Sequence, residues 1–272
     1  MIYLLLSIIS AVIIGNLLKY FQRDERVSIL VVFLGNYAVA AGISLLLNRT
    51  PIREASTFDI VIGVSIGFLY LVNFLVYNKN IRENGLSLSV SVMRVSLAIP
   101  IIISLVLFNE NILFLQYLGI AIIITAFTLL GKFSRKTTLI WVFLLFIISG
   151  ISDSGMKIFK EYSGHSTGIY LFFLFGSAFV FNILFIIVKR VKITAKPLLY
   201  GIILGIPNML TSFFFMQSLD TVPGAIAYPM LGSAVVVISI ITDFGIWRSR
   251  FTRKQIIVFT LLIIGIILLN IA

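Results

Sequence analysis

Long apolar runs alternate with short polar connections along the whole chain. A helix that crosses a membrane needs about 20 mainly apolar residues. Reading the sequence with that length predicts ten such helices, at roughly 1–21, 27–47, 58–77, 86–108, 112–131, 138–158, 168–188, 197–217, 222–243 and 254–272. A transmembrane β-barrel would instead show apolar–polar alternation in segments of about ten residues. The pattern therefore predicts an all-α membrane protein with ten transmembrane helices.

The composition agrees with this pattern, because 60% of the residues are hydrophobic and only 11% are charged. A soluble protein could not cover that much apolar surface, so most helices must face lipid or one another. The formal net charge is +11, but the basic residues stand in short loops beside apolar runs, where anionic lipid and the insertion machinery select them. We therefore expect the lipid bilayer as a partner and no nucleic acid. The sequence leaves monomer and homodimer open.

Several kinds of chemistry are absent from the sequence. There is no cysteine, which excludes a disulfide framework and a thiolate nucleophile. The sole histidine, His165, stands in a Gly-Ser loop without a nearby carboxylate cluster, so we expect an ordinary loop residue and no metal site. No Gly-Lys-Ser/Thr phosphate motif occurs, which excludes ATP-driven transport by this chain alone. No cofactor and no catalytic residue are expected.

The second half of the chain resembles the first when it is shifted by about 138 to 141 residues. The matches include Lys19 with Lys157, Gly35 with Gly176, Gly63-x-x-x-Gly67 with Gly201-x-x-x-Gly205, Asn84-Gly85 with Pro223-Gly224, and Gln116 with Gln255. A nearly constant offset across five helix pairs predicts two repeats of five helices, at 1–132 and 138–272. Because five is odd, the second repeat enters the membrane from the opposite side, which is common in secondary transporters.

The end of each half carries a recognisable motif. In the first half it comprises Asn84-Gly85-Leu86-Ser87, Pro100, Phe108-Asn109-Glu110, Leu115-Gln116-Tyr117-Leu118-Gly119 and Ala126. In the second half it comprises Gly224-Ala225-Ile226-Ala227, Gln255 and Gly265. These motifs resemble the EamA-type repeat of the drug/metabolite transporter superfamily. Two features depart from it: Arg248-Ser249-Arg250 replaces the second acidic turn, and no Trp-Gly signature opens the first helix.

The resemblance implies transport and leaves the substrate open, since similar proteins move amino acids, nucleotide sugars, quaternary amines or drugs. We expect a secondary transporter that moves a small anionic or zwitterionic metabolite across the cytoplasmic (inner) membrane by alternating access, with its site between the halves. The alternatives are a flippase for a lipid-linked metabolite, which would need an amphipathic groove, and an intramembrane enzyme. The enzyme would need a convergent catalytic set, and the sequence offers only scattered single groups.

Arg94 is the first candidate binding residue. It lies about six residues inside the fourth predicted helix, on the order of 9 Å deep at 1.5 Å per residue. An arginine at that depth is costly unless it is paired or solvated, and acidic residues are scarce in the spans. Helical spacing puts Ser87, Ser91 and Ala98 on the same face. We expect Arg94 to bind an anionic substrate group in a cavity, the alternative being that it snorkels to the rim.

Asp153 and Lys157 are spaced i,i+4 in the sixth predicted helix and can form an intrahelical ion pair. Asp153 could equally take a proton or bind an amine, since it is the one carboxylate clearly inside an apolar run. Lys19 and Asn16 either face the same cavity as Lys157 or serve at the membrane rim, where lysines snorkel.

Uncharged polar residues complete the candidate set. They are Asn36, Tyr37, Tyr70, Asn73, Asn208, Thr211, Ser212 and Tyr228. Such groups either line a central site or bond across helices, at about 0.6–2 kcal/mol each. The glycine pairs Gly63/Gly67 and Gly201/Gly205 are expected to let helices pack closely. Three prolines are expected to break or kink helices: Pro100, Pro207 and Pro229.

The basic residues also predict an orientation. Loops after odd-numbered helices carry sixteen lysines and arginines: Lys19, Arg23, Arg26, Lys79, Arg82, Lys132, Arg135, Lys136, Lys189, Arg190, Lys192, Lys196, Arg248, Arg250, Arg253 and Lys254. The other side carries four: Arg49, Arg53, Lys157 and Lys160. Basic residues favour the cytoplasmic side. Similar transporters are generally drawn with both termini in the cytoplasm, but we follow the charge count.

Both termini are therefore expected to face away from the cytoplasm. An alkaline phosphatase fused to the C-terminus should be active, and a green fluorescent protein fused there should stay dark. Fusions in the 189–196 loop serve as the matched control and should give the opposite readouts. A fluorescent C-terminal fusion together with an inactive phosphatase would contradict the predicted orientation.

Overall fold

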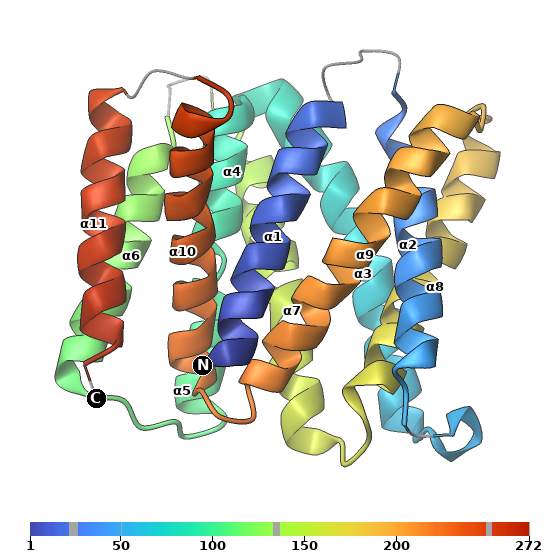
Figure 1. Cartoon of the computed structure of the whole chain (residues 1–272), viewed down its shortest axis with the longest axis horizontal. Helices are drawn as coiled ribbons and strands as arrows, with labels where there is room; N and C mark the ends of the chain where they lie inside the picture. Colours follow the sequence, from blue (N-terminus) through green and yellow to red (C-terminus); the bar gives the residue numbers. More distant parts are fainter. Residues whose placement is uncertain (22–26, 50, 133–136, 249–251, 272) are drawn as a thin grey trace. The chain divides into compact units, whose positions relative to one another are not determined.

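The computed structural model describes residues 1–21, 27–49, 51–132, 137–248 and 252–271, and no strand occurs among them (Figure 1). The helices are α1 (Ile2–Phe21), α2 (Ile29–Leu46), α3 (Thr57–Asn84), α4 (Leu86–Val95), α5 (Ala98–Val106), α6 (Phe114–Leu130), α7 (Leu139–Tyr162), α8 (Thr167–Val188), α9 (Ala195–Ser218), α10 (Gly224–Gly245) and α11 (Arg253–Leu269), with a short 3-10 helix η1 (Ile52–Glu54). Since α4 and α5 together form the fourth predicted segment, the prediction of ten helices is confirmed.

Eight of these segments are long and apolar enough to cross a membrane, with 86–106 counted as one span. The helix α6 is apolar but has only 17 residues, and α11 also has 17. Large apolar side chains such as Leu46 and Val188 are 84% and 75% exposed, as expected where lipid covers a helix. The chain is a multi-pass membrane protein.

The third helix extends further than the apolar pattern predicts, to Asn84 instead of residue 77. Polar side chains stabilise this extension. The Asn84 Nδ2 group donates to Oδ1 of Asn80 (2.6 Å), and Asn80 donates to Oγ of Ser89 (2.9 Å). Asn84 also accepts from the backbone N–H of Thr138 (2.7 Å). Hydropathy alone missed the last two turns because they are held by side-chain hydrogen bonds.

The fourth segment is broken at Ser96–Leu97. Pro100 has no N–H to donate to the Ser96 carbonyl, and its ring collides with that carbonyl. The carbonyl instead accepts from the N–H of Ile99 (2.9 Å). The prediction that Pro100 breaks a helix is confirmed, whereas Pro207 and Pro229 lie inside the continuous helices α9 and α10. The break leaves Arg94 in the last turn of α4.

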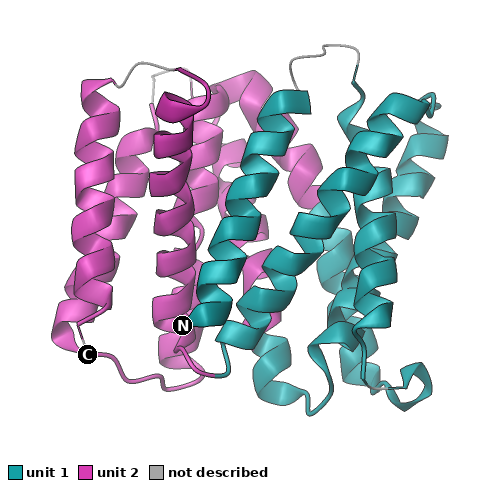
Figure 2. Cartoon of the chain, viewed as in Figure 1, with its two compact units in different colours: residues 1–71, 158–220 teal, residues 72–157, 221–272 magenta. Residues whose placement is uncertain are grey.

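The chain forms two compact units (Figure 2). Unit 1 contains residues 1–71 and 158–220, and unit 2 contains 72–157 and 221–272. Each unit therefore draws segments from both predicted repeats, so the units do not coincide with the halves 1–132 and 138–272. Within unit 1, α2 packs against α8 and α9, and within unit 2, α6 packs against α11. The inverted orientation of the two halves stays a prediction.

The two glycine pairs serve close helix packing inside unit 1, as predicted. A Cβ atom on Gly201 of α9 would lie 2.0 Å from the carbonyl oxygen of Val32 in α2. A Cβ atom on Gly67 of α3 would lie 2.3 Å from the carbonyl oxygen of Leu174 in α8. Only glycine lets the backbones approach this closely.

The residues that contact Gly201 and those that contact Gly63 stand at equivalent positions in the two halves of the chain. Gly201 meets Val32, Gly35 and Asn36, whereas Gly63 meets Tyr170, Phe173 and Leu174. Each member of the first set precedes its counterpart by 138 residues, the offset that separates Gly63 from Gly201. Phe173 therefore takes the place of Gly35 in this packing. Gly176, which sequence matching paired with Gly35, has open space around its Cα.

This difference predicts opposite effects of two alanine substitutions. Gly201→Ala should lower the unfolding free energy by about 1–3 kcal/mol, since the new methyl group overpacks the α2–α9 contact. Gly176→Ala should leave it unchanged or raise it by up to about 1 kcal/mol, because alanine favours the helix. Thermal unfolding of both proteins in the same detergent measures the effect. Equal melting temperatures for the two variants would contradict this account of the packing.

Candidate functional site

Polar side chains gather along one face of α7 in unit 2. Ser149, Asp153 and Lys157 are spaced by four residues and therefore share this face. The Ser149 hydroxyl donates to Oδ1 of Asn73 in α3 (2.8 Å). The Tyr228 hydroxyl of α10 donates to the backbone carbonyl of Asp153 (2.9 Å). The face thus receives polar groups from two neighbouring helices.

Arg94 joins this arrangement from the last turn of α4. Its guanidinium interacts electrostatically with the Asp153 carboxylate and with Tyr77 of α3. Arg94, Asp153 and Tyr77 are all partly buried. Asp153, which the sequence analysis listed as a separate candidate, is thus an acidic neighbour of Arg94. Because α3 was predicted to end at residue 77, sequence analysis also missed Tyr77 as a member of the group.

Lys157 forms its ion pair with Glu110, at 2.6 Å between Nζ and Oε1. This pair joins α7 to the α5–α6 connection. The ammonium also lies 5.4 Å from the ring centre of Phe108. Glu110 was noted only as part of the EamA-like motif. Its role here could not be seen because the pairing joins segments far apart in the sequence.

Ser87 and Ser91 do not serve the site around Arg94. The Ser87 hydroxyl donates to the carbonyl of Leu130 (2.5 Å), and the Ser91 hydroxyl donates to the carbonyl of Phe127 (2.6 Å). Both carbonyls lie in the last turn of α6, where a helix leaves its carbonyls without intrahelical partners. The two serines therefore attach α4 to the end of α6, and a role for them in binding stays a prediction.

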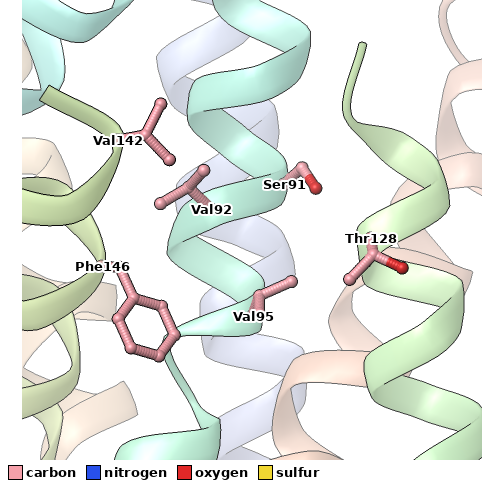
Figure 3. Close-up of a pocket in the computed structure, with 6 residues that line it drawn as sticks. All are labelled: Ser91, Val92, Val95, Thr128, Val142 and Phe146. Atoms are coloured by element: carbon pink, nitrogen blue, oxygen red, sulfur yellow. The ribbon is translucent and has the colours of Figure 1, made fainter. Parts of the chain in front are cut away.

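A small groove lies between α4, α6 and α7 in unit 2 (Figure 3). Its volume is about 150 Å³, and it is lined by Ser91, Val92, Val95, Thr128, Val142 and Phe146. Figure 3 shows Ser91 turned toward α6 and Val92 turned toward α7. Thr128 donates its hydroxyl to the carbonyl of Thr125 (2.7 Å), and Ser91 bonds α6, so the groove presents an apolar surface.

The remaining candidate residues lie in unit 1 or at the edge of the α7 face. Asn208 donates to Oδ1 of the buried Asn36 (3.1 Å). The Tyr37 ring stacks on Phe175 at 6.4 Å between ring centres, and the Tyr70 ring meets Phe175 edge-on at 6.5 Å. These contacts join helices inside unit 1, and the two asparagines serve as each other's polar partners.

Two further predicted residues in unit 1 bond their own helices. Asn16 donates to the carbonyl of Val12 (3.0 Å), and Thr211 donates to the carbonyl of Pro207 (2.8 Å). Lys19 lies in the last turn of α1. Since Lys19 and Asn16 belong to unit 1 and Lys157 to unit 2, their sharing of one cavity stays a prediction.

His165 has a partner that the sequence did not suggest. Its Nδ1 atom lies 2.5 Å from Oδ2 of the buried Asp59 at the start of α3. The Ser163 hydroxyl donates to the other carboxylate oxygen (2.6 Å). A nucleophilic triad would need the histidine between serine and carboxylate, and here the carboxylate stands between them. The cluster therefore attaches the α7–α8 connection to α3.

Comparison with known proteins decides the family. The sequence model of the EamA-like transporter family matches residues 136–271. The chain belongs to the EamA-like transporter family. This membership places it among membrane transporters of small solutes, and the matched residues include the motif at the end of the second half.

Two relatives of this EamA-like transporter extend the comparison. A protein of Haemophilus influenzae (strain ATCC 51907 / DSM 11121 / KW20 / Rd), described as uncharacterized, is 24% identical over 269 residues, covering 92% of this chain and 91% of its own. A protein of known crystal structure has a TM-score of 0.81 at 12% sequence identity, covering 98% of this chain and 96% of its own. The second likeness shows that the EamA-like chain shares a known fold.

The coupling of Arg94 to Asp153 in this EamA-like transporter is measurable by a double-mutant cycle. Arg94→Met and Asp153→Asn should each destabilise the protein. The double variant should be destabilised by less than the sum of the two, with a coupling energy of about 1–3 kcal/mol for groups in one electrostatic network. The exposed pair Lys79–Glu83 in the same unit, with side chains 46% and 38% exposed, is the matched control. Its coupling should be about 0.5 kcal/mol or less.

Unfolding in a single detergent provides all seven proteins, the wild type and three variants for each pair, with a common reference. If the coupling of Arg94 to Asp153 is no larger than that of Lys79 to Glu83, the two charged groups do not act as a pair.

Proposed function

We propose that this EamA-like protein is a secondary transporter that moves a small zwitterionic metabolite across the cytoplasmic membrane by alternating access. The observation that carries this proposal is the electrostatic interaction between Arg94 and Asp153, which lie on two apolar helices of unit 2 long enough to cross a membrane. Charged residues within spans are costly and commonly mark substrate pathways.

The pair favours a zwitterion over a simple anion. Without substrate, the guanidinium and the carboxylate compensate each other. An anionic substrate bound to Arg94 would leave the negative charge of Asp153 uncompensated, and an uncompensated charge is costly inside an apolar span. A molecule with both a carboxylate and an ammonium group replaces both partners at once. The planar guanidinium binds a carboxylate through two parallel hydrogen bonds, while Asp153 accepts from the ammonium.

The position of Arg94 also suits a moving site. It stands in the last helical turn before the break at Ser96–Leu97. Hinges commonly consist of a few residues at the end of an element that absorb a change in φ and ψ. A rotation at this break would displace the guanidinium while α7 stays in place, which changes the Arg94–Asp153 distance and the access to both groups.

Two further features of the proposal come from the sequence. The energy source is the gradient of the solute, because no nucleotide-binding motif occurs in the chain. The membrane is the cytoplasmic one, with both termini away from the cytoplasm, as the basic loops indicate. Arg23, Arg26, Arg135, Lys136 and Arg250, which contribute to that count, lie outside the described residues.

A flippase for a lipid-linked metabolite is less well supported. It would need a groove with an apolar part for the chain and a polar part for the head group. The groove between α4, α6 and α7 presents apolar side chains, and the hydroxyls of Ser91 and Thr128 are both bonded to backbone carbonyls.

The proposal is tested with purified protein in liposomes and three probes of matched shape: an amino acid, the same acid without its ammonium group, and the same amine without its carboxylate. Wild-type protein should take up the amino acid without ATP and prefer it over both analogues. Arg94→Ala should reduce uptake at least about tenfold, the equivalent of 1.4 kcal/mol. Arg94→Lys should retain part of it, since the charge remains but the two-pronged geometry is lost.

Asp153→Asn should shift the preference from the amino acid toward the plain carboxylate. Glu83→Gln, a change to an exposed charge in the same unit, serves as the control and should leave uptake unchanged. Unaltered uptake by Arg94→Ala would contradict the assigned site. Transport of a lipid-linked probe alone, with no soluble compound raising the melting temperature, would favour the flippase.

A further inference from the structure

The carboxylate of Glu110 occupies a site that the rest of unit 2 builds around it. Its Oε1 atom accepts from Lys157 Nζ (2.6 Å) and from the backbone N–H of Gly224 (2.8 Å). Its Oε2 atom accepts from the backbone N–H of Ala225 (2.8 Å). The side chains of Glu110 and Lys157 are 11% and 4% exposed. The two carboxylate oxygens of Glu110 thus accept from three donors, and the group is largely shielded from water.

These donors belong to rigid elements. Gly224 and Ala225 open the 22-residue helix α10, whose first N–H groups have no intrahelical acceptors and carry the positive end of the helix dipole. Lys157 belongs to α7. A helix N-terminus with an adjacent ammonium is well suited to bind an anion.

Ser104 of α5 supplies a further donor that Glu110 does not use. Its side chain is fully buried, and its hydroxyl has no hydrogen-bond partner among the described residues. The hydroxyl oxygen lies 2.4 Å from where a Cβ atom on Gly224 would stand, and Lys157 Cε lies 3.3 Å from the same point. The hydroxyl therefore lies at the start of α10, beside the end of the Lys157 side chain. A buried polar group without a partner in a native structure calls for a ligand or a water.

Glu110 is the one member of this group that lies outside a helix. It stands in the connection between α5 and α6, where Asn109 adopts a positive φ of 50°. The N–H of Glu110 donates to the carbonyl of Ser104 (3.2 Å), which brings the connection back over α5. The donor groups thus belong to the helices α5, α7 and α10, while the carboxylate that accepts from α7 and α10 belongs to a loop.

We propose that Lys157, the first two N–H groups of α10 and Ser104 form a carboxylate-binding site in which Glu110 is a tethered occupant that a ligand carboxylate replaces. A carboxylate fits because the site already holds one, with both oxygens bonded. The Ser104 hydroxyl is free to provide an additional hydrogen bond that Glu110 does not use. The proposal does not depend on Arg94, on Asp153 or on transport.

Truncation of Glu110 tests the site with acetate, which matches the part of the glutamate side chain beyond Cβ. Glu110→Ala should lower the melting temperature of the full-length protein in detergent. Sodium acetate should then restore it in a saturable way, while equal concentrations of sodium chloride or acetamide should not. The half-saturating acetate concentration should be at least about tenfold lower for Glu110→Ala than for wild type, since the tethered competitor is gone.

Two variants control this experiment. Lys157→Met in the Glu110→Ala background should abolish the acetate effect, and Glu83→Ala, which removes an exposed carboxylate paired with Lys79, should show none. If Glu110→Ala cannot be purified without acetate, Glu110→Gln replaces it, because the neutral amide weakens the competitor but keeps its shape. A stable Glu110→Ala or Glu110→Gln protein that responds to acetate no more than to chloride would overturn the proposal.

Discussion

An unpaired charge or an unsatisfied polar group is expensive in an apolar surrounding, and the arrangement of this protein depends on that penalty. Within a bilayer core, water does not satisfy such groups, so each must find a partner in the protein. The charged groups of unit 2 obey this constraint. Arg94 interacts electrostatically with Asp153, and Lys157 forms an ion pair with Glu110. Each pairing joins separate segments, so the constraint on charge also determines which helices lie together.

The helix ends obey the same constraint. The last carbonyls of α6 accept from Ser87, Ser91 and Lys254. The first N–H groups of α10 donate to Glu110. Polar residues that appear from the sequence to be candidates for ligand binding are in part required to satisfy backbone groups. This explains why Ser87 and Ser91 belong to the packing of α4 on α6, although Arg94 stands nearby on the same helix.

The helix α7 combines structure and candidate function. Its spacing of four residues brings Ser149, Asp153 and Lys157 to one face, and this face meets α3, α4, α10 and the α5–α6 connection. At this face, Arg94 of α4 and Asp153 carry opposite charges, which provide one anion-binding and one cation-binding group. A zwitterionic solute matches such a pair of groups, and family membership supplies the context of solute transport.

The sequence by itself determined the helices, because the length and hydropathy of a span are local properties. It also determined the α7 face and the close approach at Gly63, Gly67 and Gly201, since helical spacing and the lack of a side chain can be read directly. Only the tertiary structure decided that Lys157 pairs with Glu110. It also decided that the counterpart of Gly35 in the helix packing is Phe173 and not Gly176. Helices that are apolar on all sides carry no marked face. Their neighbours, and hence the partners of their few polar groups, follow only from packing in three dimensions.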